Sequence, residues 1–328
     1  MPLNKIFQKK KTFIIAEIGN NHEGSLLNAK KLINEAKLSG ADAVKFQFFK
    51  INKFYHTNSD AKRLHQLKKF SFTYNQINQL KNYSKKKKII FFSTPLDLDT
   101  LKELNKIQNL HKVASGDNNL LDFIEEVLKT KKTTIISTGL LSLKQIDKLY
   151  KFVKRKAKND FALMHCVSMY PTPFEDSNLN TIKIMKKKFK TAKIGYSDHT
   201  IGIKACEYAV LLGAEIIEKH FTLDKNFSKF RDHKLSANPQ EFKRMVDRIK
   251  KIDQLLHGKN EKPHKQELLN INIFRRSAFA IKNIKKKTKI KINDFLLLRN
   301  NIYKKTNKLI RLKGKTINKI QNKMEIII

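Results

Sequence analysis

Lysine and serine residues stand at the ends of several short apolar segments of this chain. Lys45 and Gln47 lie two positions apart in ADAVKFQF, so they share one face if this segment is a strand. Lys112 lies in a second segment and is followed by Ser115, and Ser137 ends a third. Two ammonium groups and two hydroxyls that converge on one cavity suit a phosphate or a phosphate-carboxylate ligand. For any one lysine alone, a surface position with its stem packed on apolar neighbours is an equally good interpretation.

Two histidines, His199 and His220, end two later apolar segments. They are too far apart in sequence to form one helical ligand motif, but on neighbouring strands they could meet at one ion. Two imidazoles without an obvious third protein ligand would leave positions open for water and substrate, as at a catalytic metal. A hydrogen-bonded structural role is the alternative for each histidine.

These residues need a scaffold that brings the ends of many strands together. Short apolar segments alternate with longer amphipathic ones through about the first 260 residues, which predicts repeated strand–helix units around a parallel sheet. We expect eight strands, at residues 12–18, 42–48, 88–93, 110–115, 133–138, 161–166, 192–197 and 214–220. Eight units predict an α/β fold of the (β/α)₈ or TIM-barrel type, with the active site at the carboxyl ends of the strands. A doubly wound sheet is the alternative, but the first turn, GNNHEGS, lacks its glycine-rich phosphate motif.

The pattern changes after residue 262. The segment KPHKQE is polar and contains a proline, and short apolar segments separated by lysine-rich turns follow it. We therefore predict a catalytic barrel over 1–262, a linker over 263–275 and a small β-rich domain over 276–328.

The chain of 328 residues is strongly basic, with 69 Lys+Arg against 29 Asp+Glu and a formal net charge of +40. This charge is typical of nucleic-acid-binding proteins, which makes such a protein the alternative of another class. Lysine, asparagine and isoleucine recur throughout, however, as an AT-rich coding sequence would produce. No aromatic residues are interleaved with the charge as a stacking surface requires, so we expect no nucleic-acid partner.

Cysteine content and hydrophobic patterning also indicate the cellular compartment. Cys166 and Cys206 are too few for a disulfide framework, which favours reducing surroundings. The basic N-terminus precedes an apolar run that Glu17 interrupts, so we expect no signal peptide. No apolar stretch approaches the roughly 18 residues of a membrane helix. We therefore expect a cytoplasmic protein with no membrane partner.

Eight segments of the chain resemble the successive motifs of one known family. They are FIIAEIGNNHEGS, ADAVKFQ, FFSTP, KVASGD, IISTG, HCVSMYPTPFED, IGYSDHTIG and EIIEKHFTLD. In order and approximate spacing they are similar to the motifs of the sialic acid synthase (N-acetylneuraminate synthase) family. The basic C-terminal part resembles that family's antifreeze-like SAF domain.

The resemblance implies a transferase that condenses phosphoenolpyruvate with an open-chain N-acyl hexosamine of the N-acetylmannosamine type, giving a nonulosonic acid and phosphate. It implies a divalent metal cofactor, Mn²⁺ in preference to Mg²⁺ or Co²⁺, bound by His199 and His220 and polarising the sugar aldehyde. Water would then add, and phosphate would leave by C–O cleavage. A barrel that has lost catalysis is a further alternative, but the presence of both histidines and of Lys45 and Lys112 argues against it.

Other site residues follow from the same motifs. The family's phosphoenolpyruvate contacts correspond to Lys45, Lys112, Ser115, Ser137 and Ser197. Glu17 and Gln47 would lie near the reacting centre, and the resemblance makes Glu17 the candidate for proton handling or for orienting water. Tyr170 would line the same cavity, with simple packing as the alternative for this residue.

The resemblance further implies a domain-swapped homodimer. In the family the small domain covers the barrel mouth of a partner subunit and places an arginine on the N-acyl group of the sugar. Arg299 stands at that position here, and Arg275 and Arg276 are less well placed candidates. Asn300 and Asn301 follow Arg299 where family members often have Pro-Gly.

Two departures from the family pattern concern the acceptor sugar. Asp117 replaces a glutamate typical of the sialate-forming members, and Ser168 replaces an asparagine. Both positions face the sugar or its neighbour in the family, so a 2,4-diacetamido-trideoxy hexose, leading to a legionaminate- or pseudaminate-like acid, is the alternative acceptor. The loop FSKFRDHKLS, with Arg231, Asp232 and His233, also differs from the common Pro-Gly-Pro-Asp form.

Overall fold

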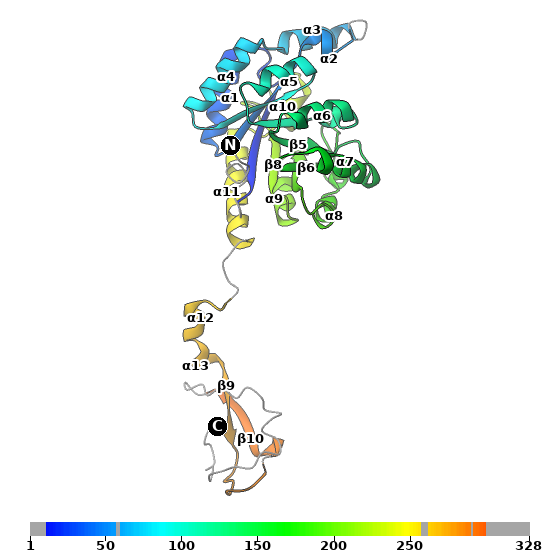
Figure 1. Ribbon diagram of the computed structural model, residues 1–328. Helices are drawn as coiled ribbons and strands as arrows, with labels where there is room; N and C mark the ends of the chain where they lie inside the picture. The colour runs from blue at the N-terminus through cyan, green and yellow to red at the C-terminus, as the bar shows by residue number, and fades with distance from the viewer. Residues whose placement is uncertain (1–10, 57–59, 257–261, 290, 300–328) are drawn as a thin grey trace. The chain divides into compact units, whose positions relative to one another are not determined.

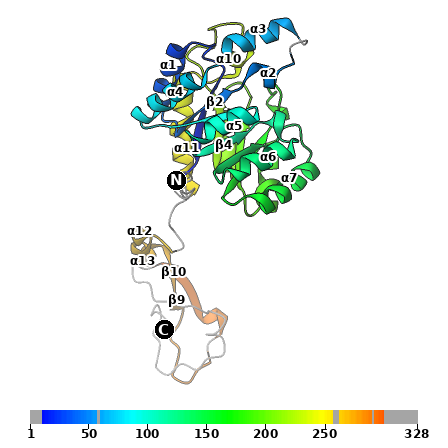
Figure 2. The same cartoon turned by 45° about the horizontal axis from the view of Figure 1, so that its top comes forward.

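The chain folds into two compact units, Met1–His257 and Gly258–Ile328. The computed structural model describes residues 11–56, 60–256, 262–289 and 291–299. In the first unit, helices surround a ring of parallel strands (Figures 1 and 2).

Eight parallel strands form this ring. They are β1 (Phe13–Gly19), β2 (Ala43–Phe48), β3 (Ile90–Pro95), β4 (Leu110–Val113), β5 (Thr133–Ser137), β6 (Phe161–Cys166), β7 (Lys193–Asp198) and β8 (Ile216–His220). They are hydrogen-bonded in the order β3-β2-β1-β8-β7-β6-β5-β4, and β3 packs beside β4. Each predicted strand lies within two residues of the observed one, and the predicted (β/α)₈ barrel is confirmed.

The strands alternate with helices that cover the outside of the ring. The α-helices are α1 (Leu26–Leu38), α2 (Ile51–Phe54), α3 (Ala61–Phe70), α4 (Tyr74–Lys86), α5 (Leu98–Asn105), α6 (Leu121–Lys129), α7 (Leu143–Lys156), α8 (Asn180–Lys188), α9 (Lys204–Leu211), α10 (Arg231–Leu235) and α11 (Pro239–Leu256), with 3₁₀ turns η2 (Ser115–Asp117) and η3 (Glu175–Ser177). Capping residues and apolar residues at helical spacing explain why these segments form helices. Helix α7, for example, starts at a capping box formed by Ser142 and Gln145 and buries Ile146, Leu149 and Val153 at helical spacing.

Side chains fill the inside of the ring and leave room for a site only at one end. Apolar residues directed inward from the strands form a separate core cluster, made of Phe13, Ile15, Ala43, Phe92, Leu110, Ile135, Ala162, Met164 and Ile216. These residues occupy the amino-terminal and central parts of the strands, so the barrel is a packed core and its polar residues gather beyond the carboxyl ends.

A side-chain amide closes the seam between β3 and β4. Gln108 lies just before β4 and is buried. Its Oε1 accepts a hydrogen bond from the backbone N–H of Ser93 at 2.8 Å, and its Nε2 donates to the backbone oxygen of Ser93 at 2.9 Å. The amide therefore satisfies the same backbone groups that a neighbouring strand would.

The second unit contains a small antiparallel sheet. Strands β9 (Arg276–Ala280) and β10 (Phe295–Arg299) pair, and the 3₁₀ turn η4 (Ile292–Asp294) precedes β10. Two short helices, α12 (Lys265–Leu269) and α13 (Ile271–Phe274), occupy most of the stretch that we expected as a linker. Residues 300–328 of the predicted SAF domain lie outside the described residues. No described helix is long and apolar enough to cross a membrane.

The seam gives a first testable prediction. Gln108→Leu leaves the buried N–H and C=O of Ser93 without partners, so we expect the free energy of unfolding to fall by about 2 to 4 kcal/mol. Urea denaturation measures the change. Gln79→Leu, at an exposed position of α4, is the matched control and should stay within about 0.5 kcal/mol of the parent protein. Equal effects of the two substitutions would contradict the role of Gln108.

Candidate active site

A polar cavity of about 280 Å³ opens at the carboxyl ends of the strands. Side chains from around the barrel line it, including Glu17 on β1, Lys45 on β2, Lys112 on β4, Ser197 on β7 and Glu218 on β8. All five are buried. The closed ring brings these residues together although they are spread over about 200 positions of the sequence.

Glu218 lies at the centre of a buried ion cluster. Its carboxylate accepts hydrogen bonds from Lys112 Nζ at 3.0 and 3.1 Å and from Ser197 Oγ at 2.9 Å. Lys45 Nζ lies 3.6 Å from the same carboxylate and 2.9 Å from Glu17 Oε2. Two ammonium groups are therefore compensated by two carboxylates inside the cavity.

The two carboxyl groups of this cluster differ in proton affinity. Burial raises the pKa of Glu17 to about 7, although Lys45 opposes the effect. Burial alone would also raise the pKa of Glu218, but Lys112 and Lys45 hold it well below the usual range. Glu17 can therefore exchange a proton near neutral pH, whereas Glu218 is a fixed anion.

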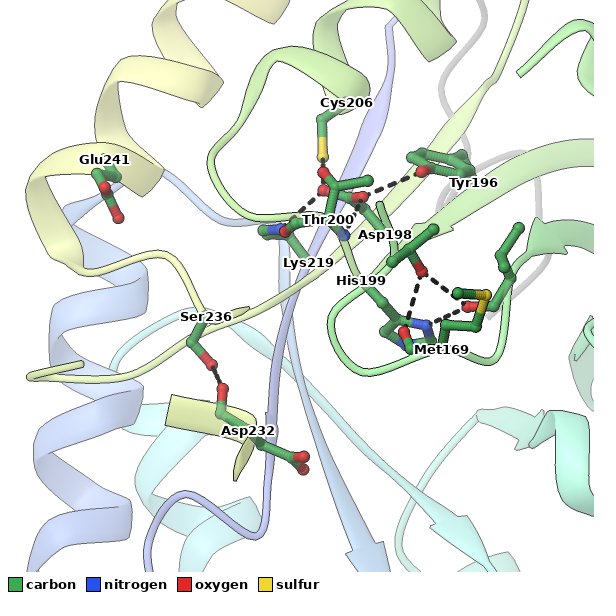
Figure 3. A network of polar contacts seen from close by, with 12 residues as sticks. Met169, Tyr196, Asp198, His199, Thr200, Cys206, Lys219, Asp232, Ser236 and Glu241 are labelled. Atoms are coloured by element: carbon green, nitrogen blue, oxygen red, sulfur yellow. Dashed lines mark hydrogen bonds and ion pairs between the residues drawn. The ribbon is translucent and has the colours of Figure 1, made fainter. Parts of the chain in front are cut away.

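A second buried ion pair lies behind the cavity. Asp198, at the end of β7, accepts hydrogen bonds from Lys219 Nζ at 2.8 Å, Tyr196 Oη at 3.0 Å, the backbone N–H of Thr200 at 2.9 Å and Cys206 Sγ at 3.3 Å. Figure 3 shows these groups gathered around the Asp198 carboxylate. Burial alone would raise the pKa of Asp198, but Lys219 helps to hold it below the usual value. The ends of β7 and β8 are thereby joined by a charged contact.

His199 and His220 lie next to each other, with their ring centroids 5.4 Å apart. The carbonyl oxygen of Val167, 2.7 Å from His199 Nδ1, can only accept, so Nδ1 carries a proton, and whenever this ring is neutral its Nε2 has the lone pair. Burial lowers the pKa of His220 well below its usual value, which keeps this imidazole neutral. Its Nδ1 is buried and has no hydrogen-bond partner among the described residues.

These imidazoles fit a divalent metal ion. Neutral rings with available nitrogen lone pairs are the form in which histidine binds metals, and the backbone contact of His199 fixes its tautomer as at known metal sites. No group of three or more His, Cys, Asp or Glu residues suited to a metal occurs in the described part of the chain. An ion held by His199 and His220 would therefore take its other ligands from water and substrate.

Aromatic and cationic side chains form the outer wall of the cavity. The Tyr170 ring lies 4.1 Å from the His199 ring, centroid to centroid. The guanidinium carbon of Arg231 lies 4.8 Å from the centroid of the same tyrosine ring. Arg63 and Asp232 line this part as well. The Tyr170 ring thus contacts both His199 and Arg231.

Comparison with known proteins assigns this barrel to a family. The NeuB family model matches residues 32–262. The chain belongs to the NeuB family. An N,N'-diacetyllegionaminic acid synthase from Campylobacter jejuni is 41% identical over 292 residues, which cover 84% of this chain and 87% of that protein. An N-acetylneuraminate-9-phosphate synthase from Drosophila melanogaster is 36% identical over 264 residues, or 76% of this chain and 71% of that protein.

A solved structure agrees with this assignment. The N-acetylneuraminic acid (sialic acid) synthetase from Leptospira borgpetersenii, in complex with citrate, superposes with a TM-score of 0.74 at 35% identity, covering 80% of this chain and 90% of that one. The resemblance inferred from the motifs is thus confirmed, and this NeuB-family protein is an N-acetylneuraminate synthase-like condensing enzyme.

The cavity contains all the site residues predicted from the sequence except two. The residues brought together are Glu17, Lys45, Gln47, Lys112, Ser115, Ser137, Ser168, Tyr170, Ser197, His199 and His220. Asp117 lies in η2 beside the lining residue Gly116, and burial raises its pKa to about 6. Arg299 ends β10 in the second unit, with its guanidinium carbon 5.9 Å from the Phe274 ring centroid. The roles of these residues stay predictions.

Other lining residues were not predicted from the sequence. Glu218 is the most central of them. Its position could have been predicted, because it lies two residues before His220 on the same strand and therefore on the same face. Arg63 belongs to α3, outside any recognised motif, and nothing in its surroundings in the sequence marks it. Arg231 and Asp232 also line the cavity, but the sequence analysis noted them only because their loop differs from the common form of the family.

The ion cluster leads to a prediction about stability. Glu218→Gln removes a charge that compensates two buried ammonium groups, so we expect the free energy of unfolding to fall by about 3 kcal/mol or more. Glu215→Gln is the control, because Glu215 forms partly exposed ion pairs with Lys193 and Lys186 and should change stability by less than about 1 kcal/mol. Chemical denaturation at neutral pH compares the two, and a smaller loss for Glu218→Gln would refute the central position of this charge.

Gly139 provides a steric prediction. A Cβ at this position would lie 2.4 Å from Ser168 Oγ and 2.7 Å from Ser115 Oγ. Gly139→Ala must therefore displace both hydroxyls, at a cost of about 1 to 3 kcal/mol in stability. In the control Gly116→Ala, the added carbon meets nothing within 4 Å. Differential scanning calorimetry should show a lower melting temperature for Gly139→Ala alone, and equal temperatures would disprove the close approach.

Proposed function

We propose that this protein condenses phosphoenolpyruvate with an open-chain N-acyl hexosamine to give a nonulosonic acid and inorganic phosphate. The observation that carries the proposal is the convergence of Lys45 and Lys112 with the His199–His220 pair in one cavity. Membership of the NeuB family, with relatives named for making three different nonulosonic acids, supports the reaction class.

Phosphoenolpyruvate would bind at the lysine end of the cavity. Lys45 and Lys112 supply buried ammonium groups, and Ser197 supplies a hydroxyl beside them. The Ser137 hydroxyl is buried and has no hydrogen-bond partner in the described structure, so it is available to an anion without breaking another contact. Glu218 holds both lysines in place, which orients their ammonium groups before the substrate arrives.

The remaining residues would act on the aldehyde and on the water. A divalent ion bound by His199 and His220 would supply Lewis-acid polarisation of the sugar aldehyde. Carbon–carbon bond formation between the phosphoenolpyruvate methylene and this aldehyde leaves a cationic C2 that water attacks, after which the C–O bond to phosphate breaks. Glu17, which lines the cavity, has a proton affinity suited to taking the proton from this water.

Phosphate release tests the proposal. We expect phosphoenolpyruvate to yield phosphate only when an N-acyl hexosamine and Mn²⁺ are both present, and chelation to stop the release. His220→Ala should weaken Mn²⁺ binding, followed by electron paramagnetic resonance, by more than about 100-fold, because a ligand is lost and not merely a supporting contact.

The control for this variant is His65→Ala, which removes an exposed imidazole on α3. It should leave both Mn²⁺ binding and phosphate release unchanged. If His220→Ala bound Mn²⁺ as tightly as the parent protein, the metal assignment would be wrong. If no N-acyl hexosamine gave phosphate release in the metal-loaded protein, the reaction itself would be wrong.

A further inference from the structure

The cationic side chains of the catalytic cavity fall into two groups by exposure. The side chains of Lys45 and Lys112 are only 5% and 3% exposed. Arg231 and Arg63 line the same cavity, but the side chain of Arg231 is 62% exposed and Arg63 is half-buried. These two residues, the mouth arginines, therefore lie where the cavity meets solvent, and the reaction as described so far gives them no role.

The inner charges of the cavity cancel one another. Lys45 and Lys112 contact Glu17 and Glu218 at distances of 2.9 to 3.6 Å, so two ammonium groups face two carboxylates. At a distance the fields of such close opposite charges largely cancel. The inner cluster can therefore hold an anion that has arrived, but it attracts one only weakly from the solvent.

The mouth arginines are compensated less completely. Asp232 is the carboxylate beside them in the cavity lining, and its Oδ1 lies 3.4 Å from Arg231 Nε. Arg63 donates to the neutral amide oxygen of Gln66 at 2.6 Å and forms no ion pair within the described residues. Four cationic side chains and three carboxylates line the cavity as a whole, so its surplus positive charge lies with the mouth arginines.

Packing holds this charge at the opening. The guanidinium carbon of Arg231 lies 4.8 Å from the Tyr170 ring centroid. Phe230, directly before Arg231, packs edge-to-face on Phe70 at the end of α3, with ring centroids 5.2 Å apart. Helices α3 and α10, which carry the two arginines, are thus joined beside the cavity.

We propose that the mouth arginines attract phosphoenolpyruvate into the cavity and so set how fast it reaches the inner lysines. This inference rests on the proposed condensation. Phosphoenolpyruvate carries both a phosphate and a carboxylate, and positive charge at the opening of a cleft focuses the field that draws such an anion inward. The acceptor sugar carries no net charge, so the mouth arginines favour one substrate of the pair and leave the other unaffected.

The test measures kcat/KM for phosphoenolpyruvate in the full-length, Mn²⁺-loaded protein with a saturating N-acyl hexosamine. The double variant Arg63→Gln/Arg231→Gln should lower this value about tenfold at an ionic strength of about 0.01 M, with a much smaller change in kcat. At about 0.15 M the screening length falls from about 30 Å to about 8 Å, so the difference should shrink to about threefold or less. At saturating phosphoenolpyruvate, kcat/KM for the uncharged sugar should change much less.

Two further variants control for charge and for shape. Lys68→Gln removes one unit of the chain's net charge of +40 from an exposed position of α3 outside the cavity lining, so it should have little effect. Arg231→Lys keeps the charge at the mouth and should retain most of the parent value at low ionic strength.

The outcomes separate this inference from the condensation itself. An effect of Lys68→Gln as large as that of the double variant would overturn the inference, because the charge of the whole protein would then attract the anion. A loss that persists undiminished at high ionic strength would overturn it as well, since it would indicate a direct contact with substrate. If calorimetry showed no binding of phosphoenolpyruvate to the Mn²⁺-loaded parent protein, the proposed condensation would fail first.

Discussion

The buried ion pair between Asp198 and Lys219 joins the two strand ends that carry the site's histidines. Both side chains are fully shielded from solvent, and a buried charge without its partner is strongly destabilising. Asp198 precedes His199 and Lys219 precedes His220, so the contact that satisfies these charges joins the two strand ends that carry the imidazoles. The ion pair therefore restricts the movement of the two strand ends that would supply the only protein ligands of the proposed metal.

Strand alternation keeps this structural pair apart from the chemistry. On β8, Glu218 and His220 line the cavity, whereas Lys219 between them contacts Asp198 on the other face. On β7, Ser197 lines the cavity and Asp198 does not. Neighbouring residues on these strands thus point to opposite faces of the barrel wall. A shift of one residue in register would turn Asp198 and Lys219 into the cavity and Ser197 and Glu218 out of it.

Charge balance allows the lysines to lie inside the barrel before substrate binds. Lys45 and Lys112 are compensated by Glu17 and Glu218, so burial of the ammonium groups does not leave net charge in a poorly solvated space. An incoming anion must then share these ammonium groups with the carboxylates. Protonation of Glu17, whose pKa is about 7, would reduce that competition without moving a side chain.

The barrel and most residues of the cavity could be predicted from the sequence, but the contacts between their side chains could not. Periodicity located all eight strands, and because parallel strand ends meet at one face of a barrel, residues such as Lys45 and His220 could be placed in one cavity. The side-chain seam made by Gln108 and the pairing of both lysines with Glu218 were not predicted, since each depends on rotamers between distant segments. The left-handed backbone at Leu140, which lines the cavity, was not predicted either, because leucine rarely adopts that conformation. Features that follow from periodicity can thus be predicted from the sequence, whereas contacts between distant segments and loop conformations that oppose local preference cannot.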